Sequence, residues 1–547
     1  NQIFKINFKP MIRIIIRNYA QLIYPILFLM FAASQVNASN LPYYKKFGML
    51  EISFESKSQT RFLFPEVIFT QPNGNKVKVD GFYDGENYKV RVYCNQIGHW
   101  KWELKGDDTF KRKKGDFEVK ESSLRGKLQI NAEDPFQFSY HNGDWFLHIG
   151  DTGYRYLTDT EQKWQEYIDH AGRLGFTKIR TWFCRSRSNV EALFNDERTS
   201  LNLTYWQEMD RRIAFAFENY PEIILQLIPF GEDTDELKRY FAGDSLSFSM
   251  LRYAQARFSA YPNIIWCISN DREIVSEGVK LTERRILDKN IDKIGLDMVR
   301  REPWKTLITN HQSRFMGYSF IDSEWSDIIT FESLDEIDGR TIAKYRVIGS
   351  DPIVNDEDRY ERYREPEYPR YFYRRLMWAS LLSGGHATYG GIKTFEAFDN
   401  DSIKGMQGYF NIGLEGANDF NNIHKFFNET GLTLVNMSPN DKIVGNSPQQ
   451  FKCIHNKNEY IIYVANPDTI GLPESPKIKS AEIRNANENI TIPAVSVSLP
   501  IAQFSLKWFD PETGIWTDTE IIKGGLSNLI APGPGDWVLY LKLKNVN

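Results

Sequence analysis

Cysteine is scarce in this sequence, and its four residues lie far apart. Cys94, Cys184, Cys267 and Cys453 form no Cys-x-x-Cys pair in a chain of 547 residues. We therefore expect neither a disulfide framework nor a zinc site rich in cysteine. We expect the four cysteines to be isolated buried thiols. The formal net charge is also small, at −4. That value excludes the strongly basic surface that nucleic-acid binding requires, so we expect no nucleic-acid partner.

Several motifs that announce a cofactor are missing as well. The sequence contains no His-Glu-x-x-His and no glycine-rich phosphate-binding loop, which argues against metalloprotease and phosphate-handling functions. We predict no metal and no organic cofactor.

Long hydrophobic runs are absent except near the beginning of the sequence. Arg13 and Arg17 precede an apolar run from Leu22 to Ala33, and small residues end at Ala38. This order is typical of a secretory signal peptide, with cleavage after Ala38, and the run is too short for a membrane span. No cysteine follows it, so a lipoprotein anchor is not expected. We assign residues 1–38 to upstream residues and a signal peptide, and expect a periplasmic or secreted protein without a membrane anchor.

The composition is that of a folded protein with several domains. Apolar residues make up 41% and charged residues 25% of the sequence, and a chain of this length exceeds one ordinary hydrophobic core, so two to four domains are expected. Aromatic residues reach 14%. Aromatic faces stack on sugar rings, but aromatic-rich cores of β domains explain the excess equally well.

The two outer parts of the sequence show the pattern of β-strands. Apolar and polar residues alternate at 88–94 and 100–104, and again at 460–464 and 504–508. A period of two places one face of a strand in a core and the other in water. We predict an N-terminal β-sandwich over 41–125 and a C-terminal β-sandwich over 440–547.

Between them, over 130–438, strands alternate with helices. Eight candidate strands are Phe146–Ile149, Thr177–Trp182, Ile223–Ile228, Ile264–Ile268, Thr306–Thr309, Asp327–Phe331, Pro352–Val354 and Ala387–Tyr389. Eight such units predict an α/β fold, a (β/α)₈ TIM barrel flanked by the two sandwiches. The fifth unit lacks a clear helix over 311–326. An open doubly wound sheet is the alternative, although no Gly-x-Gly-x-x-Gly follows the first strand.

Acidic and other polar residues gather at the ends of these strands. The candidates are Asp151, Arg180, Trp182, Asn270, Asp271, Glu273, His311, Glu332, Asp356, Glu357 and Tyr389. In such a barrel the strand ends meet at one mouth, and two carboxylates facing each other there are what glycoside cleavage requires. Structural roles remain open: Asp271 as a helix N-cap, Glu357 paired with Arg359 or Arg362, and His311 as a buried structural histidine.

Five stretches of sequence resemble the apiosidase-like glycoside hydrolases over about 140–440. They are Phe146–Thr152, Asn263–Asp271, Leu307–His311, Pro352–Glu357 and Trp378–Gly390. The N-terminal part, with Gly98-His99-Trp100-Lys101-Trp102, resembles a domain of unknown function that precedes this catalytic module. The C-terminal part, with Gly535-Asp536-Trp537-Val538-Leu539, is similar to a module named for collagen binding.

The resemblance implies a retaining glycosidase that acts on an oligo- or polysaccharide. It implies Asp271 as the acid/base, Glu357 as the nucleophile, and Asn270 as the residue that holds the sugar's 2-hydroxyl. For substrate binding it implies Asp151, Arg180, Trp182, His311, Glu332 and Tyr389. Retention predicts that the carboxylates of Asp271 and Glu357 lie about 5–5.5 Å apart.

Some assignments stay open. Glu273 is an alternative acid/base and Asp356 an alternative nucleophile, and Glu332 stands where the family pattern leads us to expect glutamine.

Two other functions compete with hydrolysis. A carbohydrate-binding barrel without activity would keep the aromatic residues but needs no pair of acids. A polysaccharide lyase could use Arg180, Arg185, Arg187 and His311. The resemblance favours a plant or algal polysaccharide as substrate; the linkage and the oligomeric state stay open.

Overall fold

The structure is a computed structural model. It describes residues 43–56, 62–106, 109–158, 164–184, 192–195, 197–231, 236–282, 285–314, 316–334, 336–361, 369–391, 415–469 and 491–544. The predicted signal peptide and Arg185, Arg187 and Arg362 lie outside these residues. Within the described part of the chain, no helix is long and apolar enough to cross a bilayer.

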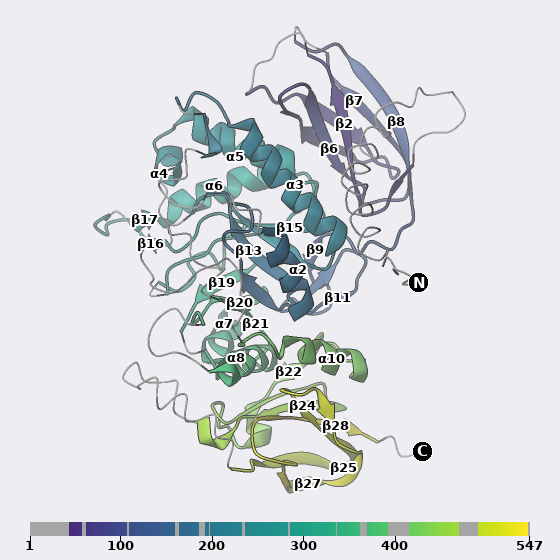
Figure 1. Ribbon diagram of the computed structural model, residues 1–547, viewed down its shortest axis with the longest axis vertical. Helices are drawn as coiled ribbons and strands as arrows, with labels where there is room; N and C mark the ends of the chain where they lie inside the picture. The colour runs from purple at the N-terminus through teal and green to yellow at the C-terminus, as the bar shows by residue number, and fades with distance from the viewer. Residues whose placement is uncertain are drawn as a thin grey trace, which may run out of the picture.

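Two packed sheets form the N-terminal domain, at the upper right of Figure 1. The first sheet has the order β1 (Tyr43–Lys45), β8 (Lys113–Lys120), β7 (Gly98–Leu104), β3 (Glu66–Thr70), β4 (Lys76–Asp80). The second has the order β2 (Met49–Phe54), β6 (Tyr88–Tyr93), β5 (Phe82–Tyr83). The strands predicted at 88–94 and 100–104 are thus confirmed as β6 and β7.

The expectation that one face of β6 meets water is wrong. Arg91 on that face is 4% exposed, because it packs against the barrel and pairs with Asp210 at 2.6 Å. Arg257 also reaches Asp210, at 2.9 Å. Buried charges are tolerated only when paired, so this cluster fixes the N-terminal domain on the barrel.

A three-stranded meander closes the floor of the barrel. Its strands are β9 (Leu128–Ile130), β10 (Phe138–Tyr140) and β11 (Trp145–Phe146). Phe138 and Phe146 share one apolar cluster with Ile224, Ile265 and Val354 from the barrel strands. The first barrel strand therefore starts later than the predicted 146–149, since Phe146 belongs to the floor.

Eight parallel strands form the barrel, which confirms the predicted fold. In sheet order they are β18 (Ile308–Thr309), β15 (Ile264–Cys267), β14 (Ile224–Ile228), β13 (Lys178–Trp182), β12 (Gly150–Thr152), β21 (His386–Tyr389), β20 (Ile353–Glu357) and β19 (Ile329–Glu332). The first and last strands are not paired along a ladder. Hydrogen bonds join them all the same. Asp327 N donates to Ile308 O at 2.9 Å, Thr309 Oγ1 donates to Ile328 O at 2.8 Å, and the hydroxyl groups of Thr309 and Thr330 lie 2.8 Å apart.

Helices surround the barrel (Figure 1). They are α2 (Trp164–Leu174), α3 (Leu203–Asn219), α4 (Glu236–Phe241), α5 (Ser245–Phe258), α6 (Asp288–Arg301), α7 (Arg340–Ile348), α8 (Arg370–Leu382) and α10 (Phe420–Thr430). The described residues between β18 and β19 contain no helix, which confirms the weak fifth unit. A pair of short strands, β16 (Glu273–Val275) and β17 (Arg285–Leu287), follows β15.

The C-terminal domain is a further antiparallel sheet. It contains β22 (Ser438–Pro439), β23 (Phe451–His455), β24 (Glu459–Val464), β25 (Ala494–Asp510), β26 (Ile515–Trp516), β27 (Glu520–Ile530) and β28 (Trp537–Leu543), with the short 3₁₀ helices η2 (Asp441–Val444) and η3 (Pro467–Thr469). Val495 and Val497, early in the long strand β25, pack in one core with Cys453, Ile462 and Leu541.

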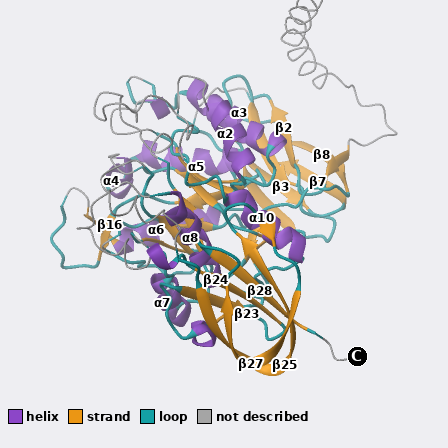
Figure 2. Cartoon of the chain, turned by 60° about the horizontal axis from the view of Figure 1, so that its bottom comes forward, coloured by secondary structure: helices purple, strands orange, loops and turns teal. Residues whose placement is uncertain are grey.

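Helix α8 connects the barrel to this domain, and Figure 2 shows it beside the C-terminal sheet. Arg374 of α8 donates to both carboxylate oxygens of Asp536, at 2.8 and 2.5 Å. The ring of Trp378 stacks on that of Tyr463 with centroids 6.4 Å apart. A buried bidentate pair of this kind fixes orientation as well as position.

The four cysteines are free and buried, as predicted. Burial raises the pKa of the Cys184 and Cys267 thiols to about 12. Such thiols are poor nucleophiles, so they serve packing.

Candidate active site

Strand β13 carries alternating polar residues into the barrel. Lys178, Arg180 and Trp182 are separated by one residue each, and all three are buried. Because neighbours on a strand point to opposite faces, these three share the inner face. Polar and charged residues on the inner face of a barrel strand need partners inside the barrel.

Asp356 on β20 supplies the partner for the deeper of these charges. Its carboxylate pairs with Lys178 Nζ, and it accepts from Gln226 Nε2 at 2.8 Å and from Thr388 Oγ1 at 2.7 Å. Arg180 Nε lies 3.3 Å from Asp356 Oδ2. Burial favours the neutral acid, but Lys178 and Arg180 hold the pKa of Asp356 well below its usual range. Asp356 therefore stays ionised. We call Asp356 and its partners Lys178, Gln226 and Thr388 the floor of the site.

Arg180 connects this floor to the mouth. Its Nη2 donates to Asn270 Oδ1 at 2.7 Å, to the Tyr154 hydroxyl at 2.6 Å and to Glu357 Oε2 at 3.2 Å. Its Nη1 reaches the same Glu357 oxygen at 3.2 Å. One guanidinium thus fixes residues from the ends of β15 and β20 relative to each other.

Glu357 points into the mouth, with one carboxylate oxygen held and one open. Among the described residues, its hydrogen bonds and ion pairs all fall on Oε2, which accepts from Arg180 and from the Tyr154 hydroxyl at 3.1 Å. His311 Nε2 lies 3.8 Å from the same oxygen. Burial raises the pKa of Glu357 above its usual value, while Arg180 and Tyr154 lower it and Asp271 raises it. Oε1 is left to face whatever enters the mouth.

Asp271, at the end of β15, has a backbone conformation that side chains rarely adopt. Its φ is 49°, in the left-handed region, which costs on the order of 1–3 kcal/mol for such a residue. Its backbone N–H donates to His311 Nδ1 at 3.3 Å. The next helix, α6, begins at Asp288 with Leu287 as its N-cap, so Asp271 caps no helix there. Strain of this kind is retained where a side chain must point in one direction.

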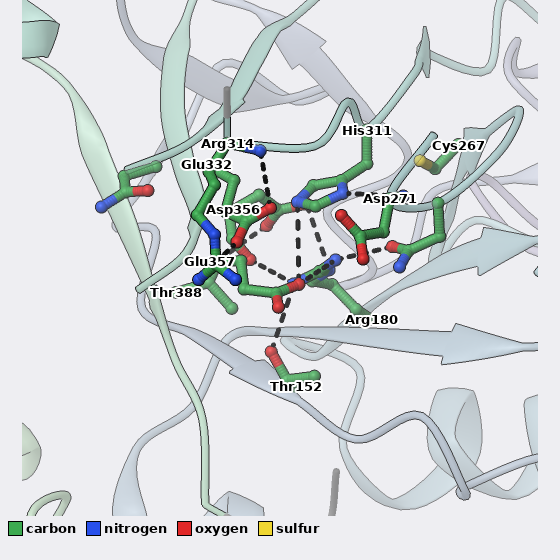
Figure 3. Close-up of polar contacts among 12 residues, drawn as sticks. Thr152, Arg180, Cys267, Asp271, His311, Arg314, Glu332, Asp356, Glu357 and Thr388 are labelled. Atoms are coloured by element: carbon green, nitrogen blue, oxygen red, sulfur yellow. Dashed lines mark hydrogen bonds and ion pairs between the residues drawn. The ribbon is translucent and has the colours of Figure 1, made fainter. Parts of the chain in front are cut away.

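His311 is buried and neutral. Burial and the neighbouring Arg180 hold its pKa well below its usual value. Since Nδ1 accepts from Asp271, the remaining proton is assigned to Nε2, which faces Glu357. Figure 3 shows Asp271, His311, Glu357 and Arg180 pointing toward one another. Asn270 shares this contact network through Arg180.

Glu332 adds a third carboxyl group to the same place. It ends β19 and stands opposite Glu357 in the register with β20, with an irregularity between Phe331 and Glu332. Its Oε2 accepts from the Arg314 backbone N–H at 2.9 Å, and its Oε1 lies 3.5 Å from Arg314 Nη1. Burial, with Glu357 and Asp271 nearby, raises the pKa of Glu332 to about 9.

Three of the predicted substrate-binding residues are placed differently. Asp151 accepts from Tyr167 of α2 at 2.6 Å, and Tyr389 donates to Glu361 at 2.6 Å. Both therefore face the layer between barrel and helices, not the mouth. Trp182 lies inside the barrel but is 5% exposed, and its ring stacks on that of Tyr154 with centroids 4.0 Å apart. Its role in the described structure is to pack against the Tyr154 ring.

The two alternative acids are occupied elsewhere. Glu273 accepts from Arg285 Nε at 2.7 Å, within the β16–β17 pair. Asp356 is fully buried in the floor described above. Among the described residues Glu357 pairs with Arg180 and not with Arg359, and the other partner considered for it, Arg362, lies outside them. Geometry thus favours Asp271 and Glu357 over their neighbours.

Sequence reasoning missed Tyr154, Arg314 and the three partners of Asp356 in the floor, Lys178, Gln226 and Thr388. Tyr154 follows a strand of only three residues, β12, so no periodicity marks its direction. The signal for Lys178 was present, since a lysine two residues before Arg180 in an apolar strand needs an internal partner. Among the described residues, no group of histidine, cysteine, aspartate and glutamate could hold a metal ion.

Comparisons with known proteins identify the central and N-terminal parts. Residues 133–433 match the family model described as "Apiosidase-like, catalytic domain", and residues 43–107 match a domain of unknown function, DUF5060. No curated protein sequence matches the chain.

Solved structures share the fold at low identity. A candidate glycoside hydrolase from Bacteroides vulgatus is 16% identical with a TM-score of 0.69, over 92% of this chain and 100% of that one. A protein titled glycoside hydrolase is 15% identical with a TM-score of 0.58, over 77% of this chain and 98% of that one. A family 5 glycoside hydrolase, also from Bacteroides vulgatus, is 14% identical with the same TM-score, over 77% and 93%. The barrel with its added sheets is therefore a shared architecture.

Because Asp356 is the buried counter-ion of Lys178 and Arg180, we predict that two acid-to-amide substitutions change the free energy of unfolding by different amounts. Asp356→Asn should lower the free energy of unfolding by about 3–5 kcal/mol, because Lys178 and Arg180 would lose a buried counter-ion. Glu273→Gln, at a partly exposed pair, should cost less than about 1 kcal/mol. Denaturant unfolding of both variants checks this. A cost for Asp356→Asn no greater than that for Glu273→Gln would contradict the proposed floor.

Proposed function

The chain belongs to the apiosidase-like family, and from that premise we propose that it is a retaining glycoside hydrolase acting on an oligo- or polysaccharide. The observation that carries the proposal is the contact of Arg180 with both Asn270 and Glu357, which sets Glu357 beside Asp271 at the barrel mouth. Two carboxyl groups with separate surroundings are the requirement for this chemistry.

Glu357 serves as the nucleophile. Its Oε2 is held by Arg180 and Tyr154, so Oε1 can attack the anomeric carbon while the partner oxygen stays fixed. Arg180 offsets the negative charge, which keeps enough of the carboxylate ionised despite burial. A nucleophile fixed in this way loses little entropy when it reacts.

Asp271 serves as the acid/base. Its half-buried side chain stands at the mouth, on a backbone that His311 holds through the Asp271 amide. In the first step it gives its proton to the leaving oxygen as the C–O bond breaks and Glu357 Oε1 bonds to the sugar. In the second step it takes a proton from water, which attacks the same carbon and releases Glu357.

Asn270 and His311 hold the sugar. Arg180 and Tyr154 both contact Asn270 Oδ1, which leaves the Asn270 amide N–H groups for an acceptor such as the 2-hydroxyl. The His311 Nε2–H, facing Glu357, can donate to a second sugar oxygen. Hydrogen bonds to the sugar near the reacting carbon strengthen in the transition state.

The natural substrate we propose is a plant or algal cell-wall polysaccharide, encountered after export. The family and the signal-peptide pattern of residues 1–38 support this. The high aromatic content is consistent with a carbohydrate substrate as well, although Trp182 stacks on Tyr154 and is not available to a sugar.

Loss of either acid should abolish hydrolysis of natural linkages. We expect Asp271→Asn to lower kcat/KM by about 10²–10⁴-fold and Glu357→Gln by at least as much, in a panel of cell-wall oligosaccharides. On aryl glycosides with a good leaving group, Asp271→Asn should retain the first step, because that step no longer needs an acid. Glu357→Gln should lose both steps.

Glu273→Gln is the matched control and should keep wild-type rates. Retained activity in both Asp271→Asn and Glu357→Gln would contradict the assignment. If the wild type binds sugars but releases none, a binding function replaces hydrolysis. A product with an unsaturated sugar that absorbs in the ultraviolet would indicate a lyase.

Removal of one hydroxyl group should move the acidic limb of the pH profile. The Tyr154 hydrogen bond lowers the pKa of Glu357, so Tyr154→Phe raises that pKa and moves the acidic limb of kcat/KM about one unit toward higher pH. Tyr389→Phe removes a buried hydroxyl whose partner is Glu361, outside the mouth, and should leave the limb in place. Equal shifts in the two variants would refute the Tyr154 role.

If the protein is exported, cleavage of the signal peptide after Ala38 should give it a single, defined N-terminus. Expressed with its leader in a bacterial host, the protein should appear in the periplasm or medium and begin at Ser39. N-terminal sequencing checks this. An uncleaved chain retained in the cytoplasm would contradict export.

A further inference from the structure

The site holds one more carboxyl group than a retaining mechanism uses. Asp271 and Glu357 account for the acid/base and the nucleophile, and Asp356 belongs to the floor. Glu332 has no part in these roles, yet it stands opposite Glu357 in the strand register and its side chain is 5% exposed. Figure 3 shows it beside Glu357, with Arg314 next to it.

The charges near Glu332 are already balanced without it. Lys178 and Arg180 are the buried cations, and Asp356 and Glu357 are the anions that pair with them. An ionised Glu332 would add a second negative charge beside Glu357.

The remaining neighbours of Glu332 supply little compensation. Arg314 is 38% exposed, so water screens its charge, and its Nη1 lies 3.5 Å from Glu332 Oε1, a long distance for a hydrogen bond. His311 is neutral, and Asp271 adds negative charge. Among these charged side chains, those of Glu357 and Asp271 repel a negative charge on Glu332 and that of Arg314 compensates it weakly.

The two oxygens of Glu332 have different surroundings. Oε2 accepts a good hydrogen bond from the Arg314 backbone N–H, at 2.9 Å. Oε1 has no comparable donor among the described residues. A carboxylic acid in this setting accepts through Oε2 and carries its proton on Oε1.

We propose that Glu332 is a specificity-determining residue that stays protonated and donates a hydrogen bond from Oε1 to an acceptor oxygen of the sugar bound against Glu357. This rests on the proposed glycosidase function for the identity of the ligand, but the protonation state does not. A neutral carboxylic acid offers one donor and one acceptor, as the side-chain amide of glutamine does. Glutamine is therefore the nearest mimic of the working form, and aspartate is not, because it withdraws the donor by one methylene.

Stability against pH tests the protonation state without any substrate. A carboxyl group whose pKa is raised on folding binds more protons in the folded than in the unfolded state. Stability then falls as pH rises from the unfolded pKa to the folded one, here from its ordinary value to about 9. Glu332→Gln removes that loss, so its Tm should exceed that of the wild type by several degrees at pH 8 and approach it near pH 4. Equal Tm differences at both pH values, or a variant less stable at pH 8, would overturn the proposal.

Activity tests the hydrogen bond to the sugar. The general acid of a retaining hydrolase gives kcat/KM an alkaline limb of its own. Ionisation of Glu332 beside Glu357 should add a further fall as pH approaches 9; Glu332→Gln should lose only this further fall, and KM rather than kcat should carry its change at pH 7. Glu332→Asp should lower kcat/KM at least tenfold. A fall near pH 9 as steep in Glu332→Gln as in wild type, or a loss as deep as that of Glu357→Gln, would refute the role. Wild type without activity on any glycoside, combined with the predicted Tm behaviour, would refute the glycosidase function and leave the protonation of Glu332 standing.

Discussion

The arrangement of the mouth depends on the Arg180 guanidinium. It is fully buried, and its charge is balanced by Asp356 below and Glu357 above. With Lys178 on Asp356, two cations face two anions; Lys178, Arg180 and Asp356 are enclosed by protein, and Glu357 reaches the mouth. Such a cluster is costly to form and specific once formed, because a missing member leaves a buried charge without a partner. Its planar fork of donors also fixes direction, so Glu357, Asn270 and Tyr154 are held in one geometry.

The rest of the fold gives this cluster a rigid surrounding. The meander of β9–β11 fills the floor of the barrel with aromatic rings, so the polar layer lies above an apolar one. Arg91 joins the N-terminal domain to the barrel through Asp210, and Arg374 joins the C-terminal domain to α8 through Asp536. Both added domains thus bind the outside of the barrel through buried charged pairs, away from the Arg180 cluster. Their structural contribution is to fix the helices against which the barrel strands pack.

Sequence patterns predicted the barrel, the flanking sheets and the central residues of the mouth, because these depend on periodicity and on position at strand ends. Asp271, Asn270, His311, Arg180, Glu332 and Glu357 come together as strand-end positions should. Asp151 and Tyr389 do not, since consecutive residues of a strand face opposite sides and short strands such as β12 give too few residues to establish which side is inner. Tyr154 lies in the turn after β12, where no period applies. The buried second face of β6 was also beyond a sequence argument, because it depends on contact with a distant helix.

The central claim, that Arg180 presents Glu357 as the nucleophile, can be tested by trapping the covalent intermediate. A 2-deoxy-2-fluoro glycoside of the preferred sugar, with a good leaving group, should react once and hydrolyse slowly, because fluorine weakens the second step. Peptide mass spectrometry of the inactivated protein should then find the sugar on Glu357. An adduct on Asp356 or Glu332, or turnover with inversion at the anomeric carbon and no adduct, would contradict the account.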